Sequence, residues 1–467
     1  MLKNKAPIIV VLNEVYSDGV GDFEHFRTIM AHLLTQEEFK DYHFVGIVGY
    51  ASRKIYQLGH KIDESATHRL NQRLLKECHE IATPFQNFEY VIGQIHSDTL
   101  KSEAILRNIQ LAEQILIVSF GFYIEQMYGK HVSSNTIVKY IGEHESLEAL
   151  AKLGNEKKCL TRSLGLTSGC YGLKIGTATH HSQEQLYEII QSYDPEFTSK
   201  ILEVFGHENI ADFFEEYLCI PAYYNTGESF AKFIQVIVTN PHMTKDKKIC
   251  FYQTGLKEAN LISMLNEYEL EFISSQTTQL IQSDTQHINA APIKIMHGFR
   301  VSDECYTALM QLAGIAGVSG DNSLEKAISL NVLPCYISTN EKEFKTLPEI
   351  QRITQLAQIS IPKSVRRSFH IYFDPDIYHE GYEKSHPFNE INFQEMKKYW
   401  PIVVDYLREN YNFYNCLNTI LKEKTEIFSN IKPILFRQLT RIKENTKHII
   451  YSGVNSIAPP PNRPENK

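Results

Sequence analysis

The chain has 467 residues, 43% of them hydrophobic and 22% charged, values that are ordinary for globular proteins with a large core. At about 150 residues per domain, this length predicts two or three domains. The 47 basic and 55 acidic residues give a net charge of −8, which argues against a protein that coats nucleic acid or an anionic membrane. The eight cysteines are scattered without a CxxC pair, so neither a structural zinc site nor a disulfide scaffold is expected.

The amino terminus shows no pattern typical of a targeting segment. The apolar run at residues 6–12 ends at Asn13 and Glu14, and it is too short for the core of a signal peptide. No run of about 18 apolar residues occurs along the chain, so no membrane span is predicted. We therefore expect a cytoplasmic protein, although export without a cleaved signal would leave no trace in the sequence.

Alternating strands and helices organise the first half of the chain. Residues 8–12 form a β-branched run typical of a strand buried on both faces, and apolar residues at helical spacing follow from Asp22. The same alternation predicts further strands at 44–48, 90–95, 115–120, 136–141 and 171–175, and further helices at 64–82, 101–111, 183–192 and 211–218. Such alternation builds a parallel sheet with helices on both faces.

A second series follows the polar stretch 241–248, which we interpret as a linker. Its predicted strands are 249–252, 270–273, 293–296, 315–318 and 333–337, and its predicted helices are 256–268, 303–313 and 323–330. Long helical patterns then occupy 393–409, 413–429 and 433–447. The proline-rich end of the chain is typical of a disordered tail.

Together these patterns predict an α/β fold with two facing doubly wound, Rossmann-like domains and extra C-terminal helices. The expected boundaries are 1–240 for the first domain, 246–385 for the second, 390–456 for the helices and 457–467 for the tail. Open α/β sheets bind ligands at the carboxyl ends of their strands, so two facing sheets would hold one ligand each.

The first candidate site is the loop that precedes the helix at Asp22. Gly19 and Gly21 permit a close approach of the backbone to a ligand, and the start of a helix attracts anions. Asp22 is a candidate general base in this loop. The alternative is that Asp22 only caps the helix by accepting a backbone N–H.

The second candidate site is the stretch 317–327, with the sequence GVSGDNSLEKA. Here the chain leaves a strand, turns at Gly320 and enters a helix that we expect Asn322 or Ser323 to cap. The N–H groups of the first turn and the Ser323 hydroxyl would face a pyrophosphate. The alternative is a well-capped helix without a ligand, with Glu325 in a position similar to that of a capping box.

Residues 318–334, VSGDNSLEKAISLNVLP, resemble the donor-phosphate helix of GT-B glycosyltransferases. Among these the chain is most similar to the bacterial protein-arginine rhamnosyltransferases. Three motifs carry this resemblance: Gly21-Asp22 matches the end of a glycine-rich loop, Gly320-Asp321-Asn322-Ser323 matches Gly-Glu-Asp-Ser, and Tyr306 with Leu309 matches a Tyr-x-x-Leu helix. Asp321 and Asn322 depart from the family's Glu and Asp, which reduces the acidic charge at this turn.

The resemblance implies a metal-independent, inverting glycosyltransferase without a cofactor. Its first domain would take the acceptor, for which a protein side chain is one candidate, and its second domain would bind a nucleotide-diphosphate sugar. Asp22 would be the general base, and Asp321 would stabilise charge or orient the acceptor. The implied donor-binding residues are Gly19, Gly21, Gly320, Asn322 and Ser323, together with Phe251 and Tyr252, which would stack on the base.

His297 and the triplet Asp374-Pro375-Asp376 are two further candidates for a functional role. His297 follows a predicted strand and precedes Gly298, so we expect it to line the same ligand site. Asp374-Pro375-Asp376 has the acid-x-acid pattern that binds metal in other transferases. Because proline between the two acids favours a turn, we expect no metal site there.

Two other classes of protein fit the same architecture. A nucleotide-sugar hydrolase or 2-epimerase would consume or isomerise the donor in the absence of an acceptor. A non-catalytic, GT-B-like interaction protein would keep the fold without the chemistry. Neither class implies a membrane span or a nucleic-acid partner.

Overall fold

The computed structural model describes residues 6–15, 21–50, 64–118, 127–142, 159–177, 179–244, 247–268, 270–274, 280–281, 293–338, 342–356, 361–378 and 390–422. The chain divides into two compact units, Met1–Tyr414 and Asn415–Lys467. The first unit contains both predicted sheets. Gly19 and the predicted helix and tail beyond residue 422 lie outside the described residues.

Among the described residues, the first sheet has six strands, all of them parallel, and it is doubly wound. Its strands are β1 (Ile8–Val15), β2 (His43–Tyr50), β3 (Phe88–Gln94), β4 (Gln114–Val118), β5 (Ile137–Gly142) and β6 (Cys159–Ser163). They lie in the order β3-β2-β1-β4-β5-β6. The order therefore reverses between β1 and β4, and this is the switch point where such sheets bind ligands.

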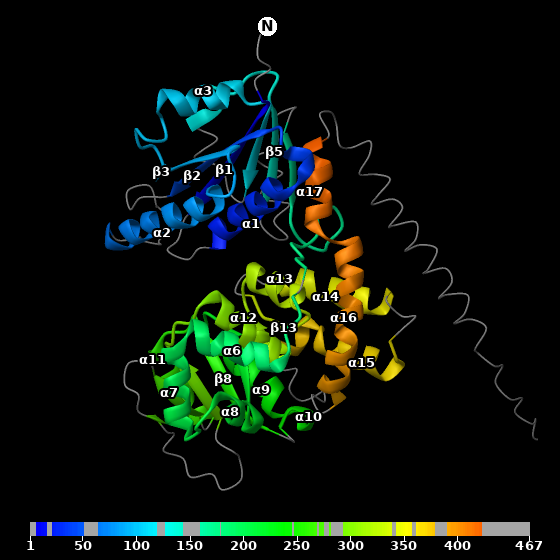
Figure 1. Ribbon diagram of the computed structural model, residues 1–467. Coiled ribbons are helices and arrows are strands. Elements are labelled where there is room, and N and C mark those ends of the chain that lie inside the picture. Colours follow the sequence, from blue (N-terminus) through cyan, green and yellow to red (C-terminus); the bar gives the residue numbers. More distant parts are fainter. Residues whose placement is uncertain are drawn as a thin grey trace, which may run out of the picture. The chain divides into compact units, whose positions relative to one another are not determined.

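Helices cover both faces of the first sheet. The helices α1 (Gly21–Thr35) and α2 (Glu64–Ala82) lie on one side of it, and α3 (Glu103–Leu111) lies on the other (Figure 1). On the α3 side, Val10 and Leu12 pack with Ile105 and Ile109 in one buried cluster. Because both faces are covered, β1 is buried almost along its whole length, as its continuous apolar run predicts.

The second sheet has seven strands among the described residues. They are β7 (Tyr217–Tyr223), β8 (Lys248–Thr254), β9 (Leu270–Ser274), β10 (Leu280–Ile281), β11 (Ile293–His297), β12 (Ile315–Val318) and β13 (Leu333–Tyr336). The order is β10-β9-β11-β8-β7-β12-β13, and all pairs are parallel except β10 with β9. Its switch point lies between β7 and β12.

Two layers of helices pack on the second sheet. One layer consists of α6 (Gln183–Tyr193), α7 (Pro195–Phe205), α8 (Ile210–Glu216) and α12 (Asp303–Ala313). The other includes α9 (Gly227–Val238), α11 (Glu258–Tyr268), α13 (Asp321–Ser329), α14 (Glu343–Leu356), α15 (Lys363–Tyr372) and α16 (Phe393–Asn410). Trp400 of α16 is fully buried in this layer, and its indole N–H donates to the carbonyl of Val332.

The structure confirms the predicted fold class of two doubly wound parallel sheets followed by helices, the last described one being α17 (Phe413–Lys422). The predicted boundary at residue 240 is wrong, because β7 pairs with β8 and β12 of the second sheet. The Asn240-Pro241 signal marks the start of the short helix α10 (Pro241–Thr244), where proline suits the first helical position. Asn240 is itself buried and donates to the Ile391 carbonyl.

The connection between the two sheets also differs from the prediction. The expected strand at 171–175 makes only isolated bridges, from Gly172 to Gly165 and from Leu173 to Asn412. Gly172 has a φ of +93°, and a Cβ there would lie 2.1 Å from the Tyr411 carbonyl oxygen. A side chain is therefore excluded at this close contact.

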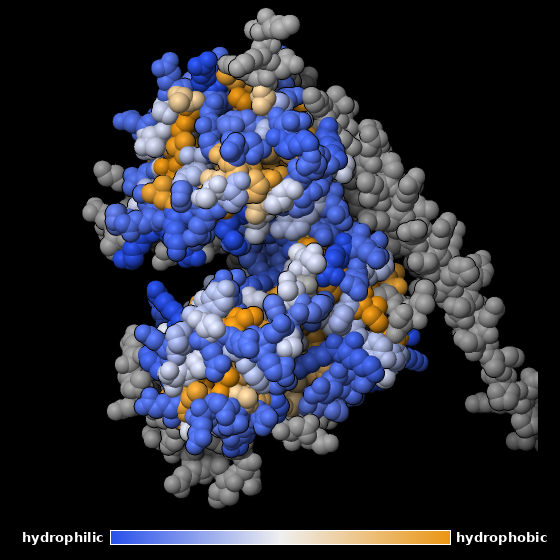
Figure 2. Space-filling model, viewed as in Figure 1, coloured by the Kyte–Doolittle hydropathy of each residue, from blue (hydrophilic) through white to orange (hydrophobic). Residues whose placement is uncertain are grey.

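Hydrophilic residues dominate the face of the molecule seen in Figure 2, and hydrophobic ones appear there as separate patches. Among the helices of the described ranges, none combines the length and the apolar character that crossing a membrane needs.

A half-buried lysine makes the stability of the second sheet's helices depend on pH. The ammonium of Lys397, in α16, donates to the carbonyl of Ala313 at the end of α12 at 2.7 Å. Burial, and then the charge of Lys247, lower its pKa from 10.5 to about 8. Between these two values the unfolded chain holds the proton that the folded chain has lost, so the free energy of unfolding rises with pH there.

We therefore expect Lys397→Met to stabilise the protein at neutral pH, by about 1–2 kcal/mol once the lost hydrogen bond is subtracted. Urea unfolding at several pH values measures this, and the gain should shrink as pH rises through the window from about 8 to 10.5. A variant that is less stable than the parent at neutral pH would contradict the expectation. Lys398→Met, the neighbouring position in α16, is the control.

Candidate active site

The start of α1 is fixed at the switch point of the first sheet. Asn13, near the end of β1, is fully buried. Its side-chain amide donates to the carbonyl of Asp22 at 3.1 Å and to that of Val118 at 3.3 Å. Gly21 and Asp22 thus begin a helix that is tied to the carboxyl ends of β1 and β4. Asp22 is half-buried there, and Glu14 lies within β1 and is fully buried.

The contribution of the two Asn13 hydrogen bonds to the free energy of unfolding can be measured. Asn13→Ala removes both hydrogen bonds and takes one donor each from the buried Val118 carbonyl and the partly buried Asp22 carbonyl, so we expect the free energy of unfolding to fall by about 1–3 kcal/mol. Asn108→Ala is the control, because Asn108 makes an exposed hydrogen bond to Glu89, and such changes stay within about 0.5 kcal/mol. Equal stability losses in the two variants would show that Asn13 does not hold α1.

The second candidate stretch forms the turn between β12 and α13. Gly320 is the N-cap of α13, so the helix begins at Asp321, two residues earlier than the predicted 323. The Ser323 hydroxyl donates to the Gly320 carbonyl at 2.7 Å and accepts from the Gly320 N–H at 3.3 Å. Ser323 therefore closes the first turn, whose remaining N–H groups have no intrahelical acceptor. The turn follows β12 at the switch point of the second sheet.

Asp321 is engaged within the protein. One carboxylate oxygen accepts from the Tyr336 hydroxyl at 2.8 Å, and the other is 2.6 Å from the Lys342 ammonium. The side chains of Lys342 and Asp321 are 18% and 13% exposed. Burial, and then the charge of Asp321, raise the pKa of Tyr336. Both carboxylate oxygens of Asp321 thus have partners within the protein, and its predicted role, to stabilise charge or orient the acceptor, stays a prediction.

A second lysine supports the same helix from the connecting segment. Lys174 is buried, and its ammonium donates to the Asn322 side-chain oxygen at 2.9 Å and lies 3.2 Å from Glu325. The Lys174 backbone N–H donates to the other oxygen of Glu325 at 2.7 Å. Both side chains of this ion pair are only 4% exposed. Glu325 is thus the partner of a buried lysine and not the capping residue that its position in the sequence predicts.

The two lysines compensate the acidic charge near the start of α13. Asp321 faces Lys342, and Glu325 faces Lys174, so each carboxylate has a cation from another part of the chain. Uncompensated acids at a helix start would repel an anionic ligand, whereas the helix dipole attracts one. The arrangement therefore preserves the anion-attracting character of the first turn. Three residues that hold the start of α13 were not identified from the sequence, because they lie far along the chain from α13 or beyond its motif. They are Lys174, Lys342 and Tyr336.

The two aromatic residues of β8 are not available to a ligand. Phe251 is fully buried and packs edge-on against Phe230 and Phe233. Tyr252 is buried on the other face, and its hydroxyl donates to the Phe299 carbonyl at 2.7 Å. The prediction that these rings stack on a base is wrong, because β8 is a central strand covered on both faces.

Tyr223 is the aromatic residue that the structure places at the switch point. It ends β7, pairs with Val318 of β12 and is 37% exposed. A Cβ on Gly320 would lie 3.9 Å from the Tyr223 ring, so the ring stands beside the turn that begins α13. The sequence signal for it is its position as the last residue of a strand, three residues before the Thr226 N-cap of α9.

Three buried polar atoms at the carboxyl edge of the second sheet have no hydrogen-bond partner among the described residues. They are the side-chain oxygens of Gln253 and Ser319 and Nδ1 of His297. His297 ends β11 beside Gln253, and its Nε2 lies 2.8 Å from the Leu256 carbonyl, so Nε2 carries the proton. Buried polar groups are nearly always hydrogen-bonded, which indicates bound water or a polar ligand at this edge.

Asp374 and Asp376 form a turn. The backbone N–H of Asp376 donates to the Asp374 carboxylate at 3.1 Å, as the short 3-10 helix η2 (Pro375–Tyr378) begins. Within the described ranges, the structure shows no group of three or more histidine, cysteine or acidic side chains placed to hold a metal ion. The turn that the sequence predicts is thus the arrangement found.

The two candidate segments are near one another in the first unit. Helix α1 contacts α13. The pKa of Arg27, in α1, is raised first by its hydrogen bond to Glu24 and also by the charge of Asp303 at the start of α12. The structure therefore brings the helix that carries Asp22 into contact with the helix that begins at Asp321.

No family model and no curated protein matches the chain. Among solved structures, it is similar to the N-terminal domain of Candida albicans trehalose-6-phosphate phosphatase (11% identity, TM-score 0.42, covering 91% of this chain and 97% of that chain). It is also similar to an alpha,alpha-trehalose-phosphate synthase (UDP-forming) from Burkholderia vietnamiensis (8%, 0.38, 90% and 99%). A third is a glycosyl transferase of family 9 from Veillonella parvula (12%, 0.30, 86% and 99%). The fold is assigned from the strand orders of the two sheets and not from these structural similarities.

Proposed function

We propose that this protein is a glycosyltransferase of the GT-B type that moves a sugar from a nucleotide-diphosphate donor to an acceptor. The observation that carries the proposal is the start of α13. It lies at the switch point of the second sheet, its acids are paired with lysines, and its sequence resembles a donor-phosphate helix. In open α/β sheets this is the place where ligands bind.

The donor's diphosphate would be held by backbone N–H groups at the start of α13. Gly320 lets the backbone approach the ligand closely, Ser323 fixes the turn through its hydrogen bonds to Gly320, and Lys174 fixes Asn322. These fixed dipoles would stabilise the negative charge that develops on the leaving diphosphate, which a metal ion does in other transferases. Tyr223 offers an exposed ring beside the same turn, and His297 lies at the same edge.

Asp22 would act as the general base toward the acceptor. Its helix is tied to the switch point of the first sheet and contacts α13, which supports a shared site for acceptor and donor. A base must lie within about 3 Å of the proton that it removes in the complex. The resemblance of the sequence to the rhamnosyltransferase family implies an inverting reaction without a metal ion. A protein side chain remains one candidate acceptor.

The proposal is tested by calorimetric titration of the full chain with UDP, GDP, dTDP and ADP and with their sugar conjugates. Binding of a nucleoside diphosphate in the micromolar range supports it, and no binding by any of them overturns it. Incubation with the bound nucleotide sugar alone then separates the activities. A hydrolase or 2-epimerase consumes or isomerises the donor without an acceptor, whereas a glycosyltransferase leaves it largely intact.

A further inference from the structure

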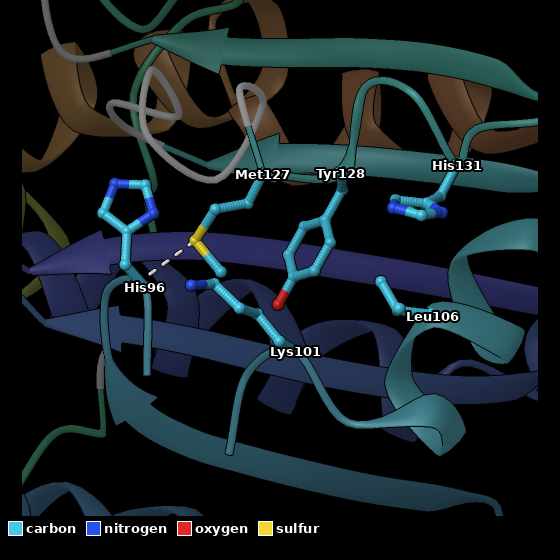
Figure 3. Close-up of a pocket in the computed structure, with 6 residues that line it drawn as sticks. All are labelled: His96, Lys101, Leu106, Met127, Tyr128 and His131. Atoms are coloured by element: carbon cyan, nitrogen blue, oxygen red, sulfur yellow. Dashed lines mark hydrogen bonds between the residues drawn. The ribbon is translucent and has the colours of Figure 1, made fainter. Parts of the chain in front are cut away.

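A pocket of about 390 Å³ lies in the part of the chain that forms the first sheet, apart from α13. Six residues line it: His96, Lys101, Leu106, Met127, Tyr128 and His131 (Figure 3). Sites for small ligands typically have volumes of about 300–1,000 Å³. The pocket is thus large enough for a small organic molecule, and nothing in the proposed donor site uses it.

The pocket is built from three separate segments around a fixed floor. His96 follows β3. Lys101 lies two residues before α3, and Leu106 lies within α3. Residues 127–131 precede β5. Tyr128 is buried, and its hydroxyl donates to the Leu100 carbonyl at 2.7 Å. Because that hydroxyl is engaged, the ring presents an apolar surface next to Leu106 and Met127 (Figure 3).

The polar part of the lining is entirely basic. His96, Lys101 and His131 are exposed to solvent, and none of the six lining residues is acidic. Within the described part of the chain, no ion pair of the Lys101 ammonium is found. An ammonium and two imidazoles at a concave site without a carboxylate favour a ligand with negative charge.

The backbone of His96 is held in an unusual conformation. Its φ is +68°, in the left-handed region that residues other than glycine seldom adopt. Its N–H donates to the sulfur of Met127 at 3.4 Å, and sulfur is a weak acceptor. This conformation places the imidazole at the rim of the pocket, on the side of Lys101 (Figure 3). Strained conformations of this kind cluster at ligand sites.

We propose that this pocket binds the phosphate group of a small phosphomonoester. The ammonium of Lys101 and the imidazole of His96, which lie on one side of Tyr128, would contact the phosphate oxygens, and His131, on the other side of the ring, would contact a polar group of the organic part (Figure 3). The organic part would pack on Leu106, Met127 and Tyr128. A phosphate group suits this end of the site because it carries up to two negative charges and several acceptor oxygens, which an ammonium and an imidazole donor can share. The site does not depend on the donor site at α13.

The test is calorimetric titration of the full chain with inorganic phosphate and with glycerol 3-phosphate at constant ionic strength. We expect saturable binding, tighter for the ester because of its apolar contacts. Lys101→Met should weaken it at least about 10-fold, since a charged hydrogen bond is lost. Lys130→Met is the matched control: it removes the same charge at an exposed position two residues after Tyr128 that does not line the pocket, and it should change binding less than about 2-fold.

The outcomes separate this pocket from the donor site. Absence of saturable phosphate binding overturns the proposal, and so does an equal loss in Lys101→Met and Lys130→Met, which would indicate a general effect of charge. Phosphate binding that survives Lys101→Met but disappears when UDP saturates the protein would place the anion at α13 and overturn it as well. Loss of phosphate binding in Lys101→Met with unchanged UDP binding supports the proposal. The phosphate titration tests the pocket even if the protein binds no nucleotide.

Discussion

Replacing Asp22 with asparagine should lower the rate of sugar transfer by about 10²–10⁴-fold, the usual contribution of a general base. The Asp22 backbone carbonyl, which accepts from Asn13, is retained in this variant, so the start of α1 should keep its position. Because the proposed donor site is at α13, the affinity for the nucleoside diphosphate should stay within about 2-fold. Initial rates of transfer and calorimetric titration with the diphosphate measure the two effects separately.

Glu24→Gln is the matched control for this variant. Glu24 lies in the same first turn of α1, and its carboxylate accepts from Arg27 at 2.7 Å. Such a partly exposed pair contributes little, so the rate should change by no more than about 3-fold. If Asp22→Asn transfers sugar at the parental rate, Asp22 is not the base. If it loses diphosphate binding together with the rate, the residue acts on the donor.

The local features of the candidate site were predictable from the sequence. A strand that ends at Val318, a turn at Gly320 and an amphipathic helix are encoded within about a dozen consecutive residues, and the structure places each within two residues of its predicted position. Neighbouring residues determine capping and helical periodicity, which explains this success. The same reasoning found the start of α1, where β1 extends to Val15 beyond the predicted end at 12.

Features that depend on long-range packing were not predictable in this way. Lys174 meets Glu325 across 151 positions, and no local pattern announces such a pair. Phe251 and Tyr252 alternate as strand residues do, but only the strand order shows that β8 is central and that both rings are covered. The strand β7 was not predicted, because residues 211–218 were assigned to one helix, and only its pairing with β8 places it in the second sheet.

Lys342→Met should weaken nucleoside diphosphate binding by about 5- to 30-fold, the effect of one uncompensated charge at a partly buried helix terminus. The substitution leaves the Asp321 carboxylate with Tyr336 but without its cation, beside the N–H groups that would receive the diphosphate. Loss of one partner from a buried ion pair also lowers stability, by about 3–5 kcal/mol at most, so circular dichroism must establish that the variant is folded. Lys345→Met, in the helix α14 that begins directly after Lys342, is the control and should bind as the parent does.

The double variant Asp321→Asn/Lys342→Met distinguishes compensation from contact. If Lys342 acts by neutralising Asp321, removing both charges restores the net charge at the start of α13, and affinity should return to within about 3-fold of the parent. If the ammonium instead leaves Asp321 to touch the phosphate, the double variant binds as weakly as Lys342→Met alone. The buried pair of Lys174 with Glu325 permits the same cycle on the other side of the helix. Recovery in both cycles would show that two lysines from distant segments keep one helix start receptive to an anion.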